Sequence, residues 1–370
     1  MGSRERRCLV FLSGNPWDWV PSRQHYLMKA LSKYIPVVWL DNSGSKRAQF
    51  KTHCPQPNIT VVQGVLPFWI AMKLRGLEGV ALPVVKTYLK RLLKDYDHVL
   101  FWSMENWLLP HRGVPYDRYI FDCIDPIFSD DAAEIEAYAK REVEILQRAD
   151  KVFATAETLA ARCREYHQDV TLLNNACAPE EYTEELVCTA PRPDWWPETA
   201  RPVAAYLGSI DWRFDFDMAD RACRDHPDLH FVLAGNIVGS LAAKAARLAA
   251  LQNVTVPGKI SVSDGRYLLS RCTIGLIPFT LGTMNDAINP VKMYAYALMG
   301  KPIAGSAVNE LRIRPDIAAT GSTPELFSAA VSQAIDRAKD GHTPEHLTRF
   351  ALDNTWEVRA EAAWQVLDCL

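Results

Sequence analysis

Short apolar runs alternate along this chain with longer segments in which apolar residues recur at helical spacing. This alternation is typical of an α/β fold with parallel sheets, because each buried strand is followed by a helix that covers it. In the first half, strands are predicted at 8–12, 37–40, 59–62, 98–101, 118–121, 151–154 and 171–173. Helices are predicted at 22–34, 83–94, 132–147 and 157–167.

A second alternating set follows an irregular, proline-rich stretch at 189–202. Its apolar runs predict strands at 203–207, 230–233, 254–256 and 274–277, with helical segments at 216–225 and 241–251. A chain of 370 residues is long enough for two domains of ordinary size. The pattern therefore predicts two domains with a cleft between them, and ligands are expected beyond the carboxyl ends of the strands.

Composition narrows the class of protein. Apolar residues make up 48%, charged residues 23%, and the net charge is −3, which is ordinary for a globular protein and argues against general nucleic-acid binding. No apolar run approaches the ~20 residues of a membrane span, and the stretch at 8–12 reads as a buried strand rather than a signal peptide. The nine cysteines lack the paired spacing of a zinc site and fit reduced thiols in a cytoplasmic protein.

The stretch 289–303 carries the clearest chemical signal. It predicts a helix with Asn289 as its N-cap and Pro290 at the first helical position, ending at Gly300 before an apolar strand. A helix N-terminus presents unpaired N–H groups and a partial positive charge, and Lys292 in the first turn adds a full charge. The candidates for phosphate binding are therefore Asn289, Pro290, Val291 and Lys292.

Six stretches resemble, in order, the donor domain of nucleotide-sugar glycosyltransferases with the GT-B fold, either GT4-like or glucuronosyltransferase-like, from bacterial cell-surface polysaccharide synthesis. They are 206–212, 231–236, 253–260, 272–279, 289–303 and 356–359. The resemblance implies an α/β fold of two Rossmann-like domains facing across a cleft. It implies an acceptor-binding domain at 1–180, to which the C-terminal helix 356–370 returns, and a donor-binding domain at 181–355.

The same resemblance implies a donor-diphosphate site. Besides 289–292, its residues are Gly208, Ser209, Arg213, Gly258 and Lys259. Fixed N–H groups and cations there would stabilise charge on the leaving diphosphate. Ordinary alternatives are a tight turn at Gly208 and solvated side chains at Arg213 and Lys292. The aspartates at 211, 215 and 217 could suggest a metal, but a helix start explains the last two, and GT-B enzymes generally bind none; neither a metal nor another cofactor is expected.

Ala295 departs from the family pattern, since related enzymes usually carry a ribose-binding Glu at this position. Glu310 and Asp286 are candidate replacements. Without that Glu, donor binding could be weaker or activity lost, and assignment to the common retaining group is weakened.

In the first half, the loop after the first strand resembles the first loop of GT-B acceptor domains. Its acceptor-side candidates are Gly14, Asn15, Trp17 and His25. Trp17 and Trp19 could stack on a sugar face, or form a hydrophobic staple against the next helix.

Two carboxylates follow the strand predicted at 118–121. An inverting transferase needs a general base at the acceptor hydroxyl, and Asp125 is the first candidate with Asp122 in reserve. The alternative is a helix cap or a buried hydrogen-bonding Asp. His25, His98 and His111 are further candidate bases.

The segment 68–94 mixes basic and apolar residues, which suits peripheral docking on an anionic membrane, although a plain solvated helix face explains it equally well. The interpretation is a cytoplasmic glycosyltransferase, on the inner face of the membrane if it docks there. It would move a sugar from a UDP- or GDP-linked donor to a glycan or lipid-linked acceptor. The alternatives are a sugar-nucleotide epimerase of the same fold, or a catalytically silent nucleotide- or glycan-binding partner.

Overall fold

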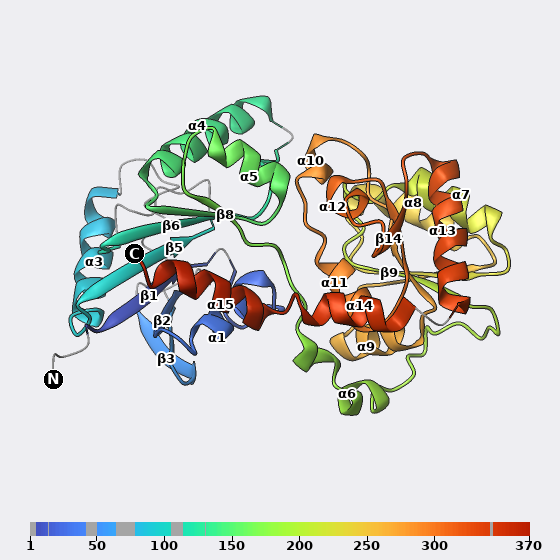
Figure 1. The fold of residues 1–370 in the computed structure, drawn as a ribbon, viewed down its shortest axis with the longest axis horizontal. Helices are drawn as coiled ribbons and strands as arrows, with labels where there is room; N and C mark the ends of the chain where they lie inside the picture. The colour runs from blue at the N-terminus through green and yellow to red at the C-terminus, as the bar shows by residue number, and fades with distance from the viewer. Residues whose placement is uncertain are drawn as a thin grey trace. The chain divides into compact units, whose positions relative to one another are not determined.

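The computed structural model describes residues 5–13, 15–41, 50–63, 78–104, 114–129, 131–340 and 343–370. The chain divides into two compact units (Figure 1). The first unit comprises Met1–Asn174 and Trp356–Leu370, and the second comprises Asn175–Thr355. The division falls a few residues before the boundary predicted at 180, and the C-terminal helix belongs to the first unit.

The first unit is built on an eight-stranded sheet in the order β3-β4-β2-β1-β5-β6-β7-β8. The strands are β1 (Arg7–Leu12), β2 (Val37–Leu40), β3 (Lys51–Gln56), β4 (Ile59–Gln63), β5 (His98–Ser103), β6 (Arg118–Cys123), β7 (Lys151–Ala154) and β8 (Val170–Leu172). All neighbouring strands pair in parallel except β3 and β4. The central strands are mostly apolar and buried because both faces of this sheet are covered.

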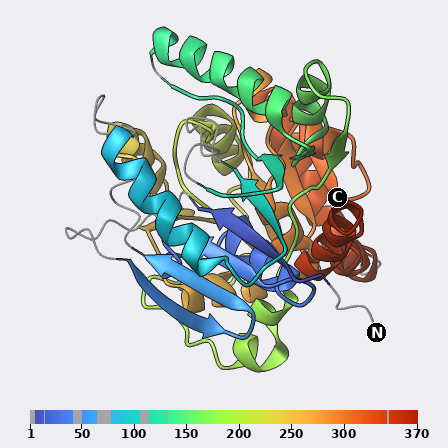
Figure 2. The same ribbon diagram turned by 90° about the vertical axis from the view of Figure 1, so that its left-hand side faces the viewer.

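Strand β3 is the element of this sheet that the hydrophobic pattern did not predict. It is an exposed edge strand with Pro55 in it, so it shows no apolar alternation. It joins β4 through a turn at Asn58, which has a positive φ of 61°. Figure 2 shows this light-blue hairpin at one edge of the sheet.

Helices α1 (Arg23–Leu31), α3 (Glu78–Leu92), α4 (Ala132–Arg148), α5 (Glu157–Arg164) and α15 (Trp356–Leu367) complete the first unit. Helix α15 lies beside α1 (Figure 1), where the rings of Tyr26 and Trp356 stack 6.0 Å apart. The guanidinium of Arg7 also donates to the carbonyl oxygen of Leu367 at 2.7 Å. These contacts attach the end of the chain to its beginning.

The second unit has a fully parallel six-stranded sheet in the order β11-β10-β9-β12-β13-β14. Its strands are β9 (Val203–Leu207), β10 (His230–Ala234), β11 (Val254–Gly258), β12 (Ile274–Ile277), β13 (Ile303–Ser306) and β14 (Ala318–Gly321). The order reverses between β9 and β12. In open parallel sheets ligands bind beyond the carboxyl ends of the strands at such a switch point, so this strand order marks where a ligand is expected.

The helices of the second unit include α6 (Glu184–Cys188), α7 (Phe216–Asp225), α8 (Ala242–Ala249), α9 (Val262–Arg271), α10 (Thr283–Asp286), α11 (Val291–Leu298), α12 (Asn309–Arg312), α13 (Pro324–Lys339) and α14 (Thr343–Leu352). The proline-rich stretch predicted to be irregular covers part of this sheet, because Trp195 and Trp196 pack on an apolar cluster that includes Val232. Within the described residues, none of the helices combines the length and apolar character needed to cross a bilayer.

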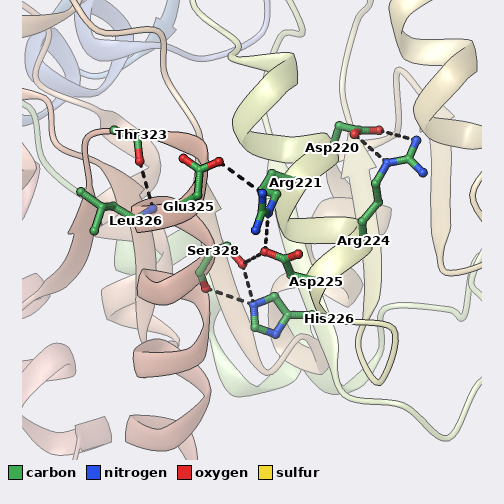
Figure 3. A network of polar contacts seen from close by, with 9 residues as sticks. All are labelled: Asp220, Arg221, Arg224, Asp225, His226, Thr323, Glu325, Leu326 and Ser328. Carbon is green, nitrogen blue, oxygen red and sulfur yellow. Dashed lines mark hydrogen bonds and ion pairs between the residues drawn. The ribbon is translucent and has the colours of Figure 1, made fainter.

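A polar network joins α7 to α13 (Figure 3). The Oγ of Ser328 donates to Asp225 at 2.7 Å, and Nε2 of His226 lies 3.0 Å from the backbone oxygen of Ser328. Arg221 bridges Asp225 and Glu325 at 2.7 and 3.2 Å. Although a serine, a histidine and an aspartate meet here, the serine hydroxyl donates to the carboxylate and not to the imidazole, so this is a helix-joining network and not a nucleophile–base pair.

Candidate functional site

Three loops that follow neighbouring strands of the second unit are joined backbone to backbone. The N–H of Gly208, after β9, donates to the oxygen of Ala234 at 3.0 Å, and the N–H of Gly235 donates to the oxygen of Gly258 at 2.8 Å. A Cβ on Gly235 would lie 1.7 Å from the oxygen of Gly208, so only glycine fits there. Sequence reasoning selected Gly208 and Gly258 but missed Gly235, because its need arises from this close approach.

Helix α11 begins at Val291, with Pro290 at the N-cap position and no side-chain capping bond. The predicted Asn289 cap is therefore wrong. Asn289 is buried, and its side-chain oxygen accepts from the N–H of Asn175 and the hydroxyl of Tyr294, both at 3.0 Å. The side-chain amide of Asn289 therefore bonds to residues distant in sequence and does not cap the N–H groups of the helix. The buried Pro290 and the exposed Val291 form the start of the helix.

The side chain of Lys292 is packed between two aromatic rings. Its Nζ lies 4.4 Å from the ring centroids of both Tyr206 and Phe279, and 3.4 Å from the hydroxyl of Tyr206. A Cβ built on Gly208 would lie 3.0 Å from the Nζ and Cε of Lys292, so the ammonium stands against the glycine turn. The alternative of a solvated surface lysine does not describe this side chain.

Desolvation lowers the pKa of Lys292 to about 7, and the positive charge of Arg213 adds to this effect while Asp211 opposes it. A cation in such surroundings is stabilised when an anion binds beside it. The lowered pKa of Lys292 therefore reflects its desolvation and the nearby positive charge of Arg213 at the Gly208 turn.

Arg213 is held by Asp211. Its Nε donates to Oδ1 of Asp211 at 2.9 Å, its terminal nitrogen pairs with Oδ2, and its backbone N–H also donates to Oδ1, at 3.0 Å. Burial acts to raise the pKa of Asp211, but hydrogen bonds from Arg213 and the charges of Arg213 and Lys292 outweigh it and leave the pKa below its usual range. Asp211 and Arg213 of the loop after β9 thus form one charged group with Lys292 of α11.

The other predicted donor-side residues lie around this group. The hydroxyl of Tyr206 donates to the backbone oxygen of Ser209 at 2.6 Å, which fixes the turn. Gly258 ends β11 with a positive φ of 76°, and Lys259 follows it as an exposed side chain. Asp215 caps α7, accepting from the N–H groups of Asp217 and Met218 at 3.0 and 2.9 Å, which agrees with the predicted helix start.

Both candidate replacements for the Glu expected at Ala295 make hydrogen bonds within the second unit. Glu310 is fully buried and accepts hydrogen bonds from Asn289 at 2.7 Å and Arg314 at 3.0 Å. Asp286 accepts from the N–H of Asn309 at 2.9 Å, at the start of α12. Both carboxylates are committed to internal bonds.

In the first unit, Asp122 and Asp125 have different environments. Asp122 is fully buried and accepts from Nε and a terminal nitrogen of Arg23 at distances of 3.1–3.2 Å. Burial raises the pKa of Asp122, and the charge and hydrogen bonds of Arg23 oppose this. Asp125 is exposed beyond the end of β6, in a loop anchored by the hydroxyl of Thr155, which donates to the oxygen of Ile124 at 2.7 Å. Asp125 is thus the more accessible carboxylate.

His25 fixes the loop after β1. Its Nδ1 accepts from the N–H of Ser22 at 3.2 Å, so the ring is neutral and its Nε2 donates to the oxygen of Pro16 at 3.0 Å. Burial lowers the pKa of His25, which is 1% exposed. With both nitrogens engaged, His25 is a positioning residue and not a base.

Trp17 packs its ring on Trp39 and His25, at centroid distances of 5.1 and 5.9 Å, with the ammonium of Lys29 5.6 Å from the ring. This favours the packing interpretation of Trp17, whereas Trp19 is 61% exposed. Asn15 closes a small turn in which the hydroxyl of Ser13 donates to its backbone oxygen at 2.6 Å. Gly14 and His111 lie outside the described residues.

Comparison with solved structures identifies the fold. The chain superposes on a sucrose-phosphate synthase from Thermosynechococcus elongatus with a TM-score of 0.74 and 15% identity, covering 98% of each chain. A UDP-forming trehalose-phosphate synthase from Burkholderia xenovorans, solved with glucose-6-phosphate, gives 0.71 and 13% identity over 98% of this chain and 100% of that one. Anabaena HepE, solved with UDP and glucose, gives 0.68 and 12% identity over 99% and 100%. The protein has the GT-B fold, as predicted, with a parallel Rossmann-like sheet in each unit.

A sequence relative is TuaH of Bacillus subtilis (strain 168), named as a proposed teichuronic acid biosynthesis glycosyltransferase. The two proteins are 24% identical over 224 residues, which cover 56% of this chain and 55% of TuaH. The match thus spans about half the length of each protein. No family model matches the chain. The predicted likeness to GT-B glycosyltransferases is confirmed.

Proposed function

We propose that this protein transfers a sugar from a nucleotide-diphosphate donor to a glycan or lipid-linked acceptor in the assembly of a cell-surface polysaccharide. The observation that carries the proposal is the placement of Lys292 against the Gly208 turn, with Arg213 held on the same loop by Asp211. Two cations and a glycine backbone at the carboxyl end of β9 suit a diphosphate, whose charge grows as the glycosidic bond breaks. Three similar proteins support this choice: the UDP-forming trehalose-phosphate synthase, HepE solved with UDP and glucose, and TuaH, named for teichuronic acid biosynthesis.

In the proposed reaction the acceptor hydroxyl attacks the anomeric carbon of the donor sugar, the bond from that carbon to the β-phosphate oxygen breaks, and the nucleoside diphosphate leaves. Lys292 and Arg213 stabilise the charge on the leaving oxygens. Asp125 is the proposed base that takes the acceptor proton, which corresponds to inversion at the anomeric carbon. Asp122 fixes Arg23 and so supports the strand end that carries Asp125.

The decisive experiment is a screen of UDP- and GDP-linked sugars, read out by nucleotide release, with membrane lipid extracts as the acceptor source. Calorimetry with UDP and GDP is run in parallel. Release that depends on the extract supports transfer. Interconversion of the donor sugar alone would indicate an epimerase. A nucleotide that binds without turnover would indicate a silent binding partner, which Ala295 specifically favours, and absence of any nucleotide binding would overturn the proposal.

Peripheral membrane contact is part of the proposal. Lys86, Lys90 and Lys94 are exposed at four-residue intervals along and just after α3, and Arg91 is exposed beside them. The rest of the segment, 68–77, lies outside the described residues. Such a row of cations is attracted to anionic lipid by about 1 kcal/mol per residue at low salt. Sedimentation with phosphatidylglycerol vesicles tests it. Binding should be lost in 0.5 M salt (about a 4 Å screening length) and in the Lys86→Glu/Lys90→Glu variant, and equal binding to neutral vesicles would contradict it.

A further inference from the structure

Three side chains able to bind a metal meet inside the first unit, at the end of the strand that leads into the loop carrying Asp125. Cys123 ends β6, Glu142 comes from α4 and Cys163 comes from α5. The two sulfurs and a carboxylate oxygen all lie within 4.8 Å of one another, and Sγ of Cys123 is 3.8 Å from Oε1 of Glu142. Each of the three residues is at most 3% exposed.

The hydrogen bonding at this cluster is incomplete. Arg162 donates to Oε1 of Glu142 at 2.6 Å and approaches Sγ of Cys123 at 3.5 Å. The other oxygen of Glu142, Oε2, is buried and has no hydrogen-bond partner among the described residues, and the same holds for Nε of Arg162. A buried carboxylate oxygen without a partner lowers stability. Oε2 of Glu142 can therefore accept one further bond, for example from a bound cation.

We propose that Cys123, Glu142 and Cys163 bind one zinc ion, with water in the fourth position. Zinc prefers tetrahedral sites made of thiolate, imidazole and carboxylate, in which neighbouring sulfur and oxygen ligands stand about 3.5–3.8 Å apart. The 3.8 Å between Sγ of Cys123 and Oε1 of Glu142 agrees with this spacing, and the ligand atoms of all three residues lie within 4.8 Å of one another. Binding deprotonates both thiols, and the two protons pass to solvent.

The charges of the loaded site balance. One Zn²⁺, two thiolates and one carboxylate sum to a single negative charge, and the guanidinium of Arg162 neutralises it. In this arrangement Oε2 of Glu142 binds the metal while Oε1 keeps its hydrogen bond to Arg162. The arginine then supports the ligands from outside, as hydrogen-bonding neighbours of metal ligands commonly do.

The position of the cluster gives the metal a structural role. Glu142, Ile145 and Leu146 are the buried residues of α4, whose other residues are at least partly exposed. A bond from Glu142 to a metal shared with β6 and α5 would fix α4 to the sheet. This structural role of the metal does not depend on the glycosyl transfer proposed above.

The test measures metal in the full-length protein under reducing conditions. After incubation with zinc and dialysis against metal-free buffer, we expect about one zinc per chain by elemental analysis. Replacement by Co²⁺ should give thiolate-to-cobalt charge-transfer absorption. Cys123→Ser and Cys163→Ser should abolish both signals, whereas Cys223→Ser and Cys272→Ser, which change buried thiols of the second unit, should keep them. Arg162→Ala should keep the stoichiometry but weaken zinc binding about 10–100-fold.

A measurement on the wild-type protein tests the proposal even if the variants do not fold. Zinc should raise the unfolding temperature of the intact protein, and a chelator should reverse the rise. Less than about a tenth of an equivalent of zinc, with no cobalt absorption, would overturn the proposal. So would full zinc stoichiometry in both serine variants. A disulfide between Cys123 and Cys163 would also overturn it, if the protein took up no zinc after that disulfide was reduced. The two cysteines would then form a redox-active pair.

Discussion

A methyl group on Gly235 would stand 1.7 Å from the backbone oxygen of Gly208, so the loop after β10 and the loop after β9 touch through bare backbone. The contact holds the Gly208 turn where Lys292 meets it. The geometry of the proposed diphosphate site therefore depends on a residue that contributes no side chain to it.

Replacing Gly235 by alanine should displace the Gly208 turn. The positive φ of 156° alone costs about 1–3 kcal/mol for a non-glycine residue, and the clash adds to this. We expect a lower unfolding temperature and weaker UDP or GDP binding in calorimetry. Gly239→Ala is the matched control, because a Cβ there meets no atom within 4 Å, and it should change stability by less than about 0.5 kcal/mol. Unchanged nucleotide binding by a folded Gly235→Ala variant would contradict the role of this contact.

Nucleotide binding should depend on the charge of Lys292. Because desolvation lowers the pKa of Lys292 to about 7 in the unliganded protein, the ammonium form predominates below pH 7 and is lost above it. An anionic ligand favours the ammonium, so affinity should fall as pH rises from 6 to 9, approaching about tenfold per unit above the pKa. Calorimetry across this range measures the slope. Lys292→Met should bind weakly with a flatter profile, which also separates this effect from titration of the phosphate itself.

We expect Asp211 to influence nucleotide binding by holding Arg213 in place. Asp211→Asn removes the charge that holds the guanidinium and that helps keep Lys292 protonated. We expect weaker nucleotide binding and a pH profile shifted to lower pH, since one source of positive-charge stabilisation is gone. Asp217→Asn, in the first turn of α7, is the control, because the substitution keeps the backbone N–H that donates to Asp215. If Asp211→Asn kept the wild-type pH profile, the electrostatic link would be wrong.

Substitution of Asp122 should lower stability, whereas substitution of Asp125 should lower turnover. Asp122→Asn leaves the buried Arg23 without its counter-charge, and losing one partner of a buried ion pair costs about 3–5 kcal/mol. Asp125→Asn changes an exposed side chain, so it should keep the unfolding temperature and nucleotide affinity while abolishing transfer. Thermal unfolding and nucleotide release with acceptor measure the two effects. Retained turnover by Asp125→Asn would remove it as the base.

The hydrophobic pattern predicted most strands because central parallel strands are buried on both faces and form apolar runs. It missed β3, an exposed edge strand without that signature, and the short edge strand β14 (AATG). The glycine turn in 206–213 and the helix start near 290 were predictable because such features have local sequence signals. The role of Asn289 was not, since its partners Asn175 and Glu310 are distant in sequence.

By itself the sequence determined the alternation of strands and helices, the two α/β sets and the candidates for phosphate binding, because these depend on local periodicity and residue chemistry. Tertiary structure alone decided which charges act together. It placed Lys292 between Tyr206 and Phe279, committed Glu310 and Asp286 to internal bonds, and gathered Cys123, Glu142 and Cys163. The physical reason is that desolvation and pairing depend on neighbours brought together by strand order, which no local pattern records.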